Sequence, residues 1–194
     1  MAATTAAAGP EVPCYFIFGD SLVDSGNNNG MKSLAMADYL PYGIDFPGGP
    51  SGRFCNGKTS VDVIADQLGF SDPIPSYAKA RGREILGGVN FASAAGGIRN
   101  ETGYQLGVRT GMDGQVRNYQ STVAAMVELM GGDEGATAEY LKQCIFTLGM
   151  GSNDYLNNYF MPYFYSSSRR LTPEQYADAL IAEYHQQIRI LYNY

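Results

Sequence analysis

The stretch 14-CYFIFGDSLVDSGNNN-29 places five apolar residues directly before a turn rich in carboxylates, serines and asparagines. A continuous apolar run of this length, ended by Gly19-Asp20, is typical of a strand buried on both faces of a parallel sheet. Ser21 follows the strand, where a turn would present its hydroxyl at the edge of the sheet. The stretch therefore predicts an α/β fold, and it makes Ser21 either a nucleophile or a turn residue.

Two further apolar runs end in loops of similar composition. Residues 88–92, Gly-Val-Asn-Phe-Ala, lead into the small residues 93–97, and residues 144–148, Cys-Ile-Phe-Thr-Leu, lead into 149-GMGSND-154. Strands that alternate with helices predict a parallel sheet with flanking helices. Sites of open α/β sheets lie at the carboxyl ends of the strands. We therefore expect the three loops to converge.

Helical patterns lie between and after these runs. Their apolar faces comprise Val61, Ile64, Ala65 and Leu68; Val116, Tyr119, Val123, Met126, Val127 and Met130; and Tyr176, Leu180, Tyr184, Ile188 and Leu191. Thr59 or Ser60 is expected to cap the first helix, and the capping box 172-TPEQ-175 begins the last. One helical turn is expected near Lys32–Tyr39. Residues 1–13 are interpreted as a disordered tail and 14–194 as part of a single domain.

The composition excludes several classes of function. The 194 residues are 45% hydrophobic and 16% charged, which is enough for one buried core. The formal net charge is −6 and the basic residues are scattered, so no nucleic-acid partner is expected. No apolar run reaches the roughly 18–20 residues that span a bilayer. Residues 1–13 lack the basic and apolar blocks of a signal peptide.

Three cysteines and one tripeptide bear on the cellular compartment. Cys14, Cys55 and Cys144 are odd in number and widely spaced, so they fit no metal site and no complete disulfide framework. We expect buried free thiols, with disulfides as the alternative, and neither a metal nor a cofactor. Asn100-Glu-Thr102 is an acceptor sequence for N-glycosylation, which is meaningful only in a secreted protein. Such tripeptides also arise by chance, so this one favours secretion only slightly.

The three loops together carry the residue types of a serine hydrolase. A serine becomes a nucleophile when a base removes its proton and donors stabilise the oxyanion. Candidate donors are the Ser21 amide, an amide within 94–97 and the side-chain NH₂ of Asn153. Each loop also has a plain structural explanation, as a helix cap, a close backbone contact or a turn. The occurrence of all three, each after a strand, favours the catalytic interpretation.

Longer motifs resemble those of the GDSL esterase/lipases, which belong to the SGNH hydrolase superfamily. The first three conserved blocks of that family are matched in order by 18-FGDSL-22, by 88-GVNFAS-93 with Gly97, and by 149-GMGSND-154. The plant branch is the most similar, through 24-DSGNNN-29, 39-YLPYGIDFP-47 and 52-GRFCNG-57. The resemblance extends from Pro13 to Tyr194.

The resemblance implies a three-layer, flavodoxin-like fold with five strands in the order 2-1-3-4-5. Residues 14–18 would then lie between the other two runs, and 144–148 would be an open apolar edge of a sheet that is incomplete on its C-terminal side. Ser21 corresponds to the nucleophile. The oxyanion donors would be the Ser21 amide, the Asn153 side chain and a block-two amide, for which we select Gly97.

The general base of the family, a histidine in an Asp-x-x-His motif, has no counterpart in these residues. The single histidine, His185, follows Ala182 where the motif has aspartate, and a lone helical histidine is usually structural. Asp20 and Asp24 are too weak as bases for a serine hydroxyl. The activity of this polypeptide alone is therefore expected to be weak or absent.

By resemblance, the function is that of an extracellular serine carboxylester hydrolase that acts on a small ester or lipid through an acyl-enzyme on Ser21. Two alternatives stay open. One is a catalytically inactive relative that binds an acyl, glycan or protein ligand. The other is a truncated product without a function of its own.

Overall fold

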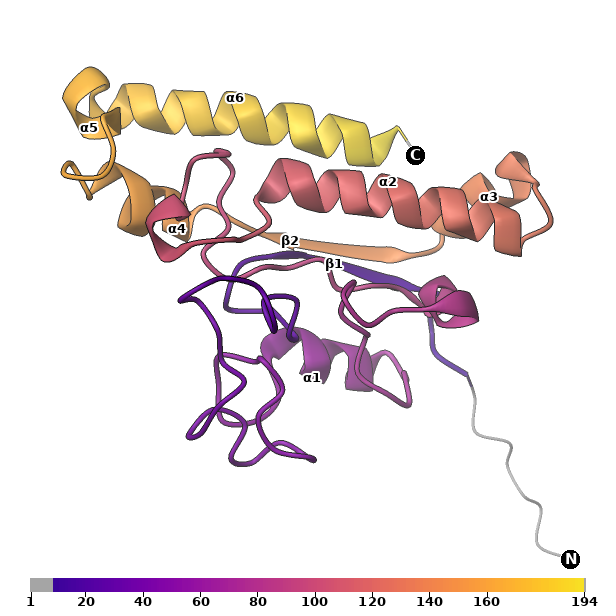
Figure 1. Cartoon of the computed structure of the whole chain (residues 1–194). Coiled ribbons are helices and arrows are strands. Elements are labelled where there is room, and N and C mark those ends of the chain that lie inside the picture. The colour runs from indigo at the N-terminus through magenta and orange to yellow at the C-terminus, as the bar shows by residue number, and fades with distance from the viewer. Residues whose placement is uncertain (1–8, 194) are drawn as a thin grey trace, which may run out of the picture.

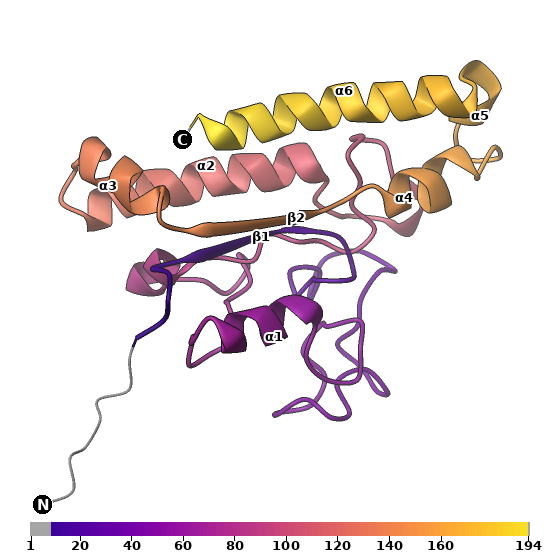
Figure 2. The ribbon, with the colours of Figure 1, turned by 180° about the vertical axis from the view of Figure 1, so that it is seen from behind.

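The computed structural model describes residues 9–193, which are arranged in three layers (Figure 1). A parallel sheet forms the middle layer. Helices α2 (Met112–Leu129) and α6 (Pro173–Tyr192) lie on one side of it, and α1 (Ser60–Gln67) lies on the other, as the view from behind also shows (Figure 2). The predicted α/β fold, with a parallel sheet and flanking helices, is confirmed.

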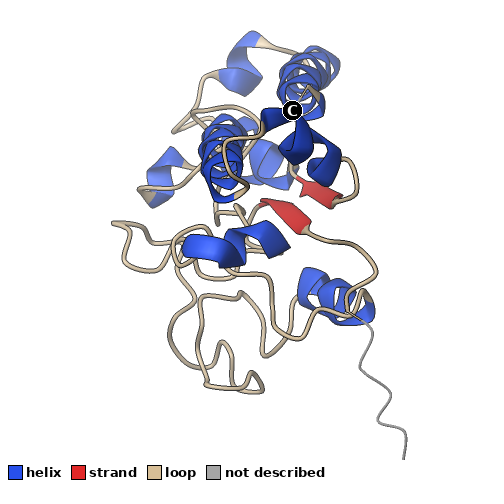
Figure 3. Cartoon of the chain, turned by 90° about the vertical axis from the view of Figure 1, so that its right-hand side faces the viewer, coloured by secondary structure: helices blue, strands red, loops and turns tan. Residues whose placement is uncertain are grey.

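The sheet contains two regular strands within residues 9–193, β1 (Tyr15–Gly19) and β2 (Ile145–Gly149). They pair in parallel, from Tyr15 opposite Ile145 to Gly19 opposite Gly149. The end-on view shows them between the helical layers (Figure 3). The other elements are α3 (Glu134–Leu141), α4 (Ser152–Asp154), α5 (Ser167–Arg170), 3-10 helices at Gly82–Gly87 and Tyr104–Leu106, and a π-helical turn at Tyr155–Tyr159.

Residues 88–92 lie where the third strand was predicted but do not form a regular strand. The segment runs parallel to β1, on the edge opposite β2: the Ile17 amide donates to the Val89 carbonyl over 3.1 Å, and the Phe91 amide to the Ile17 carbonyl over 2.8 Å. Asn90 directs its own amide and carbonyl to the opposite edge, toward Pro75 and Tyr77, as the alternation along a strand requires. Each of the two pairings is a single parallel bridge, Ile17 with Asn90 and Ser76 with Asn90, and neither extends into a ladder. The predicted order, with β1 in the middle, is confirmed, whereas the strand itself was wrong.

The residues of β1 alternate between two parts of the core. Phe16 and Phe18 face α2, where the Tyr119 ring lies 5.3 Å from the Phe16 ring, centroid to centroid. Tyr15 and Ile17 face α1. All four β1 side chains are at most 1% exposed. Burial on both faces explains why the strand is apolar at every position.

Capping side chains begin two helices where the sequence predicted them. Thr59 accepts a hydrogen bond from the Asp62 amide, and Thr172 accepts one from the Gln175 amide. In both pairs the third residue returns a hydrogen bond to the amide of the cap, which completes a capping box. Helix α3 was not predicted, because its sequence lacks an apolar stripe; the Asp133 side chain caps it.

Three local predictions were wrong. No helical turn forms near Lys32–Tyr39, because this segment pairs with a distant loop; the Leu34 amide donates to the Leu106 carbonyl over 2.7 Å. Ile64 and Ile188 were placed on the buried faces of their helices but are exposed. Each helix buries a narrower stripe than the full apolar pattern suggests.

The prediction of free thiols was wrong for two of the three cysteines. Cys14 and Cys144 form a disulfide, while Cys55 is free. Each disulfide cysteine directly precedes a strand, and the parallel register brings their Cα atoms to 4.8 Å, a separation that a disulfide spans. The two residues are 130 positions apart in sequence, so only the pairing of β1 with β2 reveals them as partners.

The predicted tail, 1–13, lies largely outside the described residues, which begin at Gly9. Where the chain is described, it contacts the layer that contains α1. The Glu11 amide donates to the Leu68 carbonyl over 2.8 Å, directly after the end of that helix. This hydrogen bond fixes the segment that leads into β1 against the end of α1.

Strand β2 has one unpaired edge among the described residues. It pairs with β1 alone, and its residues are half-buried or exposed, whereas β1 is buried throughout. Phe146, Leu148 and Leu191 line an apolar hollow of about 430 Å³ between this strand and the end of α6. Within residues 9–193 the expected open apolar edge is therefore present.

Candidate active site

A tight turn after β1 contains Ser21. The Asp20 carbonyl accepts hydrogen bonds from the amides of Val23 and Asp24, over 3.2 and 3.0 Å, and the Asp20 carboxylate accepts one from the Leu22 amide over 3.0 Å. Ser21 is half-buried, and neither its amide nor its hydroxyl has a hydrogen-bond partner among residues 9–193. Both polar groups of Ser21 are therefore available to a ligand.

Gln115 on α2 binds the end of β1, a role that was not predicted from the sequence. Its side-chain oxygen accepts from the Gly19 amide over 3.0 Å, and its NH₂ group donates to the carbonyls of Gly19 and Thr110, over 2.8 and 3.0 Å. Gln115 is fully buried, so these bonds satisfy polar groups that water does not reach. Its only signal in the sequence is a polar residue on the apolar face of a helix.

Asp24 connects the first loop to the second. Its carboxylate is fully buried and accepts hydrogen bonds from the amides of Gly26, Asn27 and Ala94, over 2.8, 2.7 and 3.0 Å. Asn28 adds a second link, because its side chain donates to the Ala94 carbonyl over 3.0 Å. The aspartate and asparagines after Ser21 thus fix the turn of the second loop.

The buried position of Asp24 predicts a pH-dependent stability. Burial raises the pKa of its carboxyl from 3.8 to about 6, because hydrogen bonds from backbone amides only partly replace the lost water. The folded protein binds this proton more tightly than the unfolded chain does. The stabilising contribution is therefore complete below about pH 4 and is lost as the pH rises through about 6, a difference on the order of 3 kcal/mol.

We expect this contribution to disappear in Asp24→Asn, which has no carboxyl to titrate. The measurement is the free energy of unfolding in urea between pH 4 and pH 7. The advantage of the wild type over the variant should decrease as the pH rises. Asp72→Asn, which removes an exposed carboxyl, is the matched control. An advantage that grows with pH would show that the amides outweigh the burial.

The loop after β2 places Asn153 against the second loop. Its side-chain NH₂ donates to the Gly96 carbonyl over 2.9 Å, and its side-chain oxygen accepts from the Asn157 NH₂ over 2.7 Å. The residue is 8% exposed. One hydrogen of the Asn153 NH₂ group is thus engaged, and the other has no partner among residues 9–193.

Asp154, the neighbour of Asn153, binds the backbone after the second loop, a role that was not predicted from the sequence. Its buried carboxylate accepts from the amides of Ile98 and Arg99, over 2.8 and 3.0 Å, and from the Thr102 hydroxyl over 2.7 Å. Burial raises the pKa of this carboxyl, and the three hydrogen bonds oppose the rise. The third loop is therefore bound to the segment that follows the second.

The first and third loops also meet. The Ser152 hydroxyl donates a long hydrogen bond of 3.5 Å to the Asp20 carboxylate, and these two residues directly precede Asn153 and Ser21. Burial raises the pKa of Asp20, while hydrogen bonds from the Leu22 amide and the Ser152 hydroxyl lower it. All three loops are thus connected at the carboxyl ends of the strands.

The turn of the second loop has two available amides. The amides of Ala94 and Gly96 already donate within the protein. Those of Ala95 and Gly97 have no acceptor within residues 9–193. A Cβ atom on Gly97 would lie 2.7 Å from a carboxylate oxygen of Asp154, so this position requires glycine.

Residues 15–193 match the model of the family described as GDSL-like Lipase/Acylhydrolase. The chain belongs to this family. Two GDSL esterase/lipases of Arabidopsis thaliana are each 65% identical to it, over 187 and 189 residues, or 96% and 97% of this chain. Another from the same plant is 61% identical over 183 residues, or 94% of this chain. The chain spans about half the length of these relatives, 50–52%.

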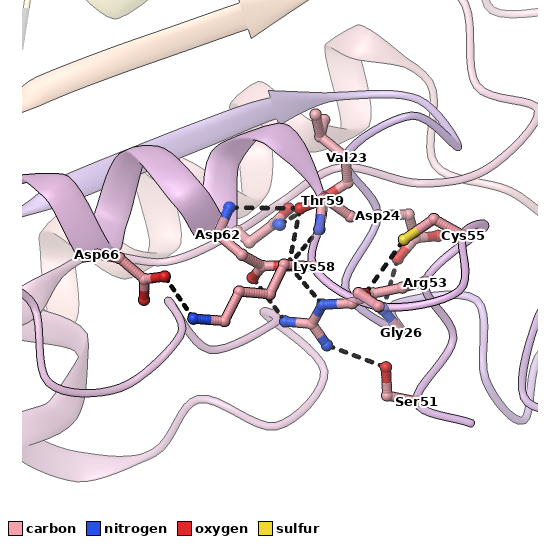
Figure 4. Close-up of polar contacts among 12 residues, drawn as sticks. Val23, Asp24, Gly26, Ser51, Arg53, Cys55, Lys58, Thr59, Asp62 and Asp66 are labelled. Atoms are coloured by element: carbon pink, nitrogen blue, oxygen red, sulfur yellow. Dashed lines mark hydrogen bonds and ion pairs between the residues drawn. The ribbon is translucent and has the colours of Figure 1, made fainter. Parts of the chain in front are cut away.

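A plant GDSL motif, 52-GRFCNG-57, joins the long loop after the first block to α1 (Figure 4). The Arg53 guanidinium donates to both carboxylate oxygens of Asp62, over 2.7 and 2.8 Å, and both side chains are buried. The amide and hydroxyl of Thr59 also donate to Asp62, and the Phe46 ring lies 4.3 Å from the guanidinium carbon. A buried pair with all of these partners is a structural anchor.

No residue in the described part of this GDSL-family chain is placed to deprotonate Ser21. His185 is exposed on α6 and makes no hydrogen bond with another described residue. The Asp20 carboxylate accepts from the Leu22 amide and the Ser152 hydroxyl, and the Asp24 carboxylate accepts from backbone amides. Residues 9–193 also contain no group of three His, Cys, Asp or Glu side chains that is arranged to hold a metal ion.

Proposed function

We propose that this chain provides the nucleophile and the oxyanion donors of a serine carboxylester hydrolase. The observation that carries the proposal is a set of hydrogen-bond donors on connected loops that have no partner among residues 9–193. These are the amide and hydroxyl of Ser21 and one hydrogen of the Asn153 NH₂ group. Donors that no described protein group accepts from, at the carboxyl ends of parallel strands, are available to a ligand that accepts hydrogen bonds.

In the proposed reaction, the Ser21 oxygen attacks the carbonyl carbon of the ester, the alcohol leaves, and water later hydrolyses the acyl-enzyme. The carbonyl oxygen becomes an oxyanion, which the Ser21 amide, the Gly97 amide and the Asn153 NH₂ would stabilise. A base must take the Ser21 proton. The histidine of an Asp-x-x-His motif, which the family resemblance implies, has the pKa range for this role.

The substrate class that fits is a small ester or a lipid ester, and the compartment is a secretory one. Two independent features support the compartment: the acceptor sequence at Asn100 and the disulfide between Cys14 and Cys144, since disulfides persist in oxidising environments. The helices of residues 9–193 include none with the length and apolar character needed to cross a membrane.

The test uses a longer form, in which this chain is extended with a family-like C-terminal half that includes the Asp-x-x-His motif. Asn153→Ala should lower kcat for p-nitrophenyl acetate by about 10²–10³-fold, the usual effect of losing one oxyanion donor. KM should change little, because the donor acts mainly on the transition state. Ser71→Ala, which removes an exposed serine, is the control. An unchanged kcat in Asn153→Ala would overturn the oxyanion assignment, and an active Ser21→Ala would overturn the nucleophile.

A further inference from the structure

Asn100 lies in an exposed turn after the second loop. The Thr102 amide donates to the Arg99 carbonyl over 3.1 Å, which closes the turn, and the Arg109 guanidinium donates to the Asn100 carbonyl. The Asn100 side chain makes no hydrogen bond with a described residue and faces solvent. Its amide nitrogen is therefore sterically open to a large modifying group. Asn100-Glu-Thr102 is the only Asn-x-Ser/Thr tripeptide in the sequence.

Thr102, the third residue of this tripeptide, has the opposite environment. It is 1% exposed, and its hydroxyl donates to the Asp154 carboxylate over 2.7 Å and accepts from the Asn158 NH₂ over 3.0 Å. The enzyme that glycosylates asparagine recognises the hydroxyl of the third residue as well as the asparagine. In the folded protein that hydroxyl is enclosed.

We propose that Asn100 is an N-glycosylation site that is usable only before the chain folds. The reaction forms a bond between the Asn100 side-chain nitrogen and the anomeric carbon of an oligosaccharide carried on a lipid diphosphate. The bond from that carbon to the diphosphate oxygen breaks, the lipid diphosphate leaves, and the nitrogen loses one proton. The inference rests on the secretory compartment in the proposed function, which the disulfide between Cys14 and Cys144 supports independently of Asn100.

The order of synthesis provides the time for this reaction. The groups that enclose Thr102 come from Asp154 and Asn158, and Asp154 follows Thr102 by 52 residues. At 5–20 residues per second, about 3–10 s pass before Asp154 has been made. The disulfide closes later than the acceptor sequence appears, since Cys144 also follows it. The site is therefore open first and buried afterwards.

The two ends of the acceptor sequence predict different consequences of mutation. Asn100→Gln removes the acceptor nitrogen and touches no hydrogen bond of the side chain. Thr102→Ala destroys the acceptor sequence, although the Asn100 nitrogen stays, and it also removes the hydroxyl that joins Asp154 to Asn158. Thr102→Ser keeps the hydroxyl and the acceptor sequence, so it is the matched control for both.

The first experiment expresses the longer form that includes the Asp-x-x-His motif, behind a secretory signal, in a eukaryotic cell. Peptide-N-glycosidase should remove one glycan from the wild type and from Thr102→Ser, and none from Asn100→Gln. Mass spectrometry should find Asn100 converted to aspartate. A secreted wild type with unmodified Asn100 overturns the site. Ester hydrolysis is measured on the same samples, so an inactive but glycosylated protein counts against the proposed function alone.

The second experiment tests the order of events. Unglycosylated, disulfide-bonded protein from bacteria, the same protein after reduction and unfolding, and a synthetic peptide of residues 98–104 are each given to solubilised microsomes with lipid-linked oligosaccharide. The peptide and the unfolded chain should accept the glycan, and the folded protein should not. Glycosylation of the folded protein at the rate of the peptide would overturn the proposed order.

Discussion

A polypeptide of these 194 residues is expected to hydrolyse p-nitrophenyl acetate at about a millionth of the rate of a form that includes the Asp-x-x-His motif. The reason is the missing base: in a serine hydrolase, loss of the histidine costs on the order of 10⁶ in kcat. The donors alone retain about 10³–10⁴ over water. The measurement compares initial rates of the two forms at equal concentration, and Ser21→Ala should abolish the activity of the longer form.

Two outcomes would contradict this expectation in different ways. Robust hydrolysis by the short form that survives His185→Ala but not Ser21→Ala would mean that another group activates Ser21. Robust hydrolysis that His185→Ala abolishes would make His185 the base. His185 is exposed on α6 and makes no hydrogen bond with another described residue, so nothing in residues 9–193 orients it as a base for Ser21.

The sequence predicted those parts of the fold that depend on local pattern. β1 could be predicted from the sequence because both of its faces are buried, and every position from Cys14 to Phe18 is therefore apolar. The start of α6 is readable because Thr172 and Gln175 satisfy each other's backbone groups within one turn. The regular strand expected at 88–92 is absent because its pairing with Ile17 on one side and with Ser76 on the other is limited to one bridge each, and the local apolar pattern does not show how far a pairing extends.

In the candidate site, too, some residues could be predicted from the sequence and others could not. Ser21 and Asn153 could be proposed because their motifs directly follow apolar strands. The side chains that hold those motifs in place could not, because Asp24, Asp154 and Gln115 each bind at least one backbone group that is 56–96 residues away. Such contacts exist only after folding, and a buried polar residue in a sequence does not show which backbone group it will satisfy.

The disulfide also joins residues that are distant in sequence, and we expect its loss to change the free energy of unfolding strongly. Removing it with Cys14→Ser and Cys144→Ser together should lower the free energy of unfolding by about 5 kcal/mol, if the bridge acts by restricting the unfolded chain. The estimate is large because the bridge joins residues 130 positions apart. Urea denaturation of the oxidised wild type and of the double variant, in the form that includes the Asp-x-x-His motif, is the measurement.

Cys55→Ser separates the bridge from the general effect of losing a thiol. Cys55 is free and half-buried, and its thiol donates to the Gly57 carbonyl over 3.2 Å, so its replacement by another donor should change the unfolding free energy little. Reduction should lower the unfolding free energy of the wild type by more than that of the double variant, and the difference is the contribution of the bridge. If the reduced wild type unfolds at the same urea concentration as the oxidised protein, the bridge does not stabilise the fold. Such a result would mean that the pairing of β1 with β2 and the burial of β1 hold the strands together without it.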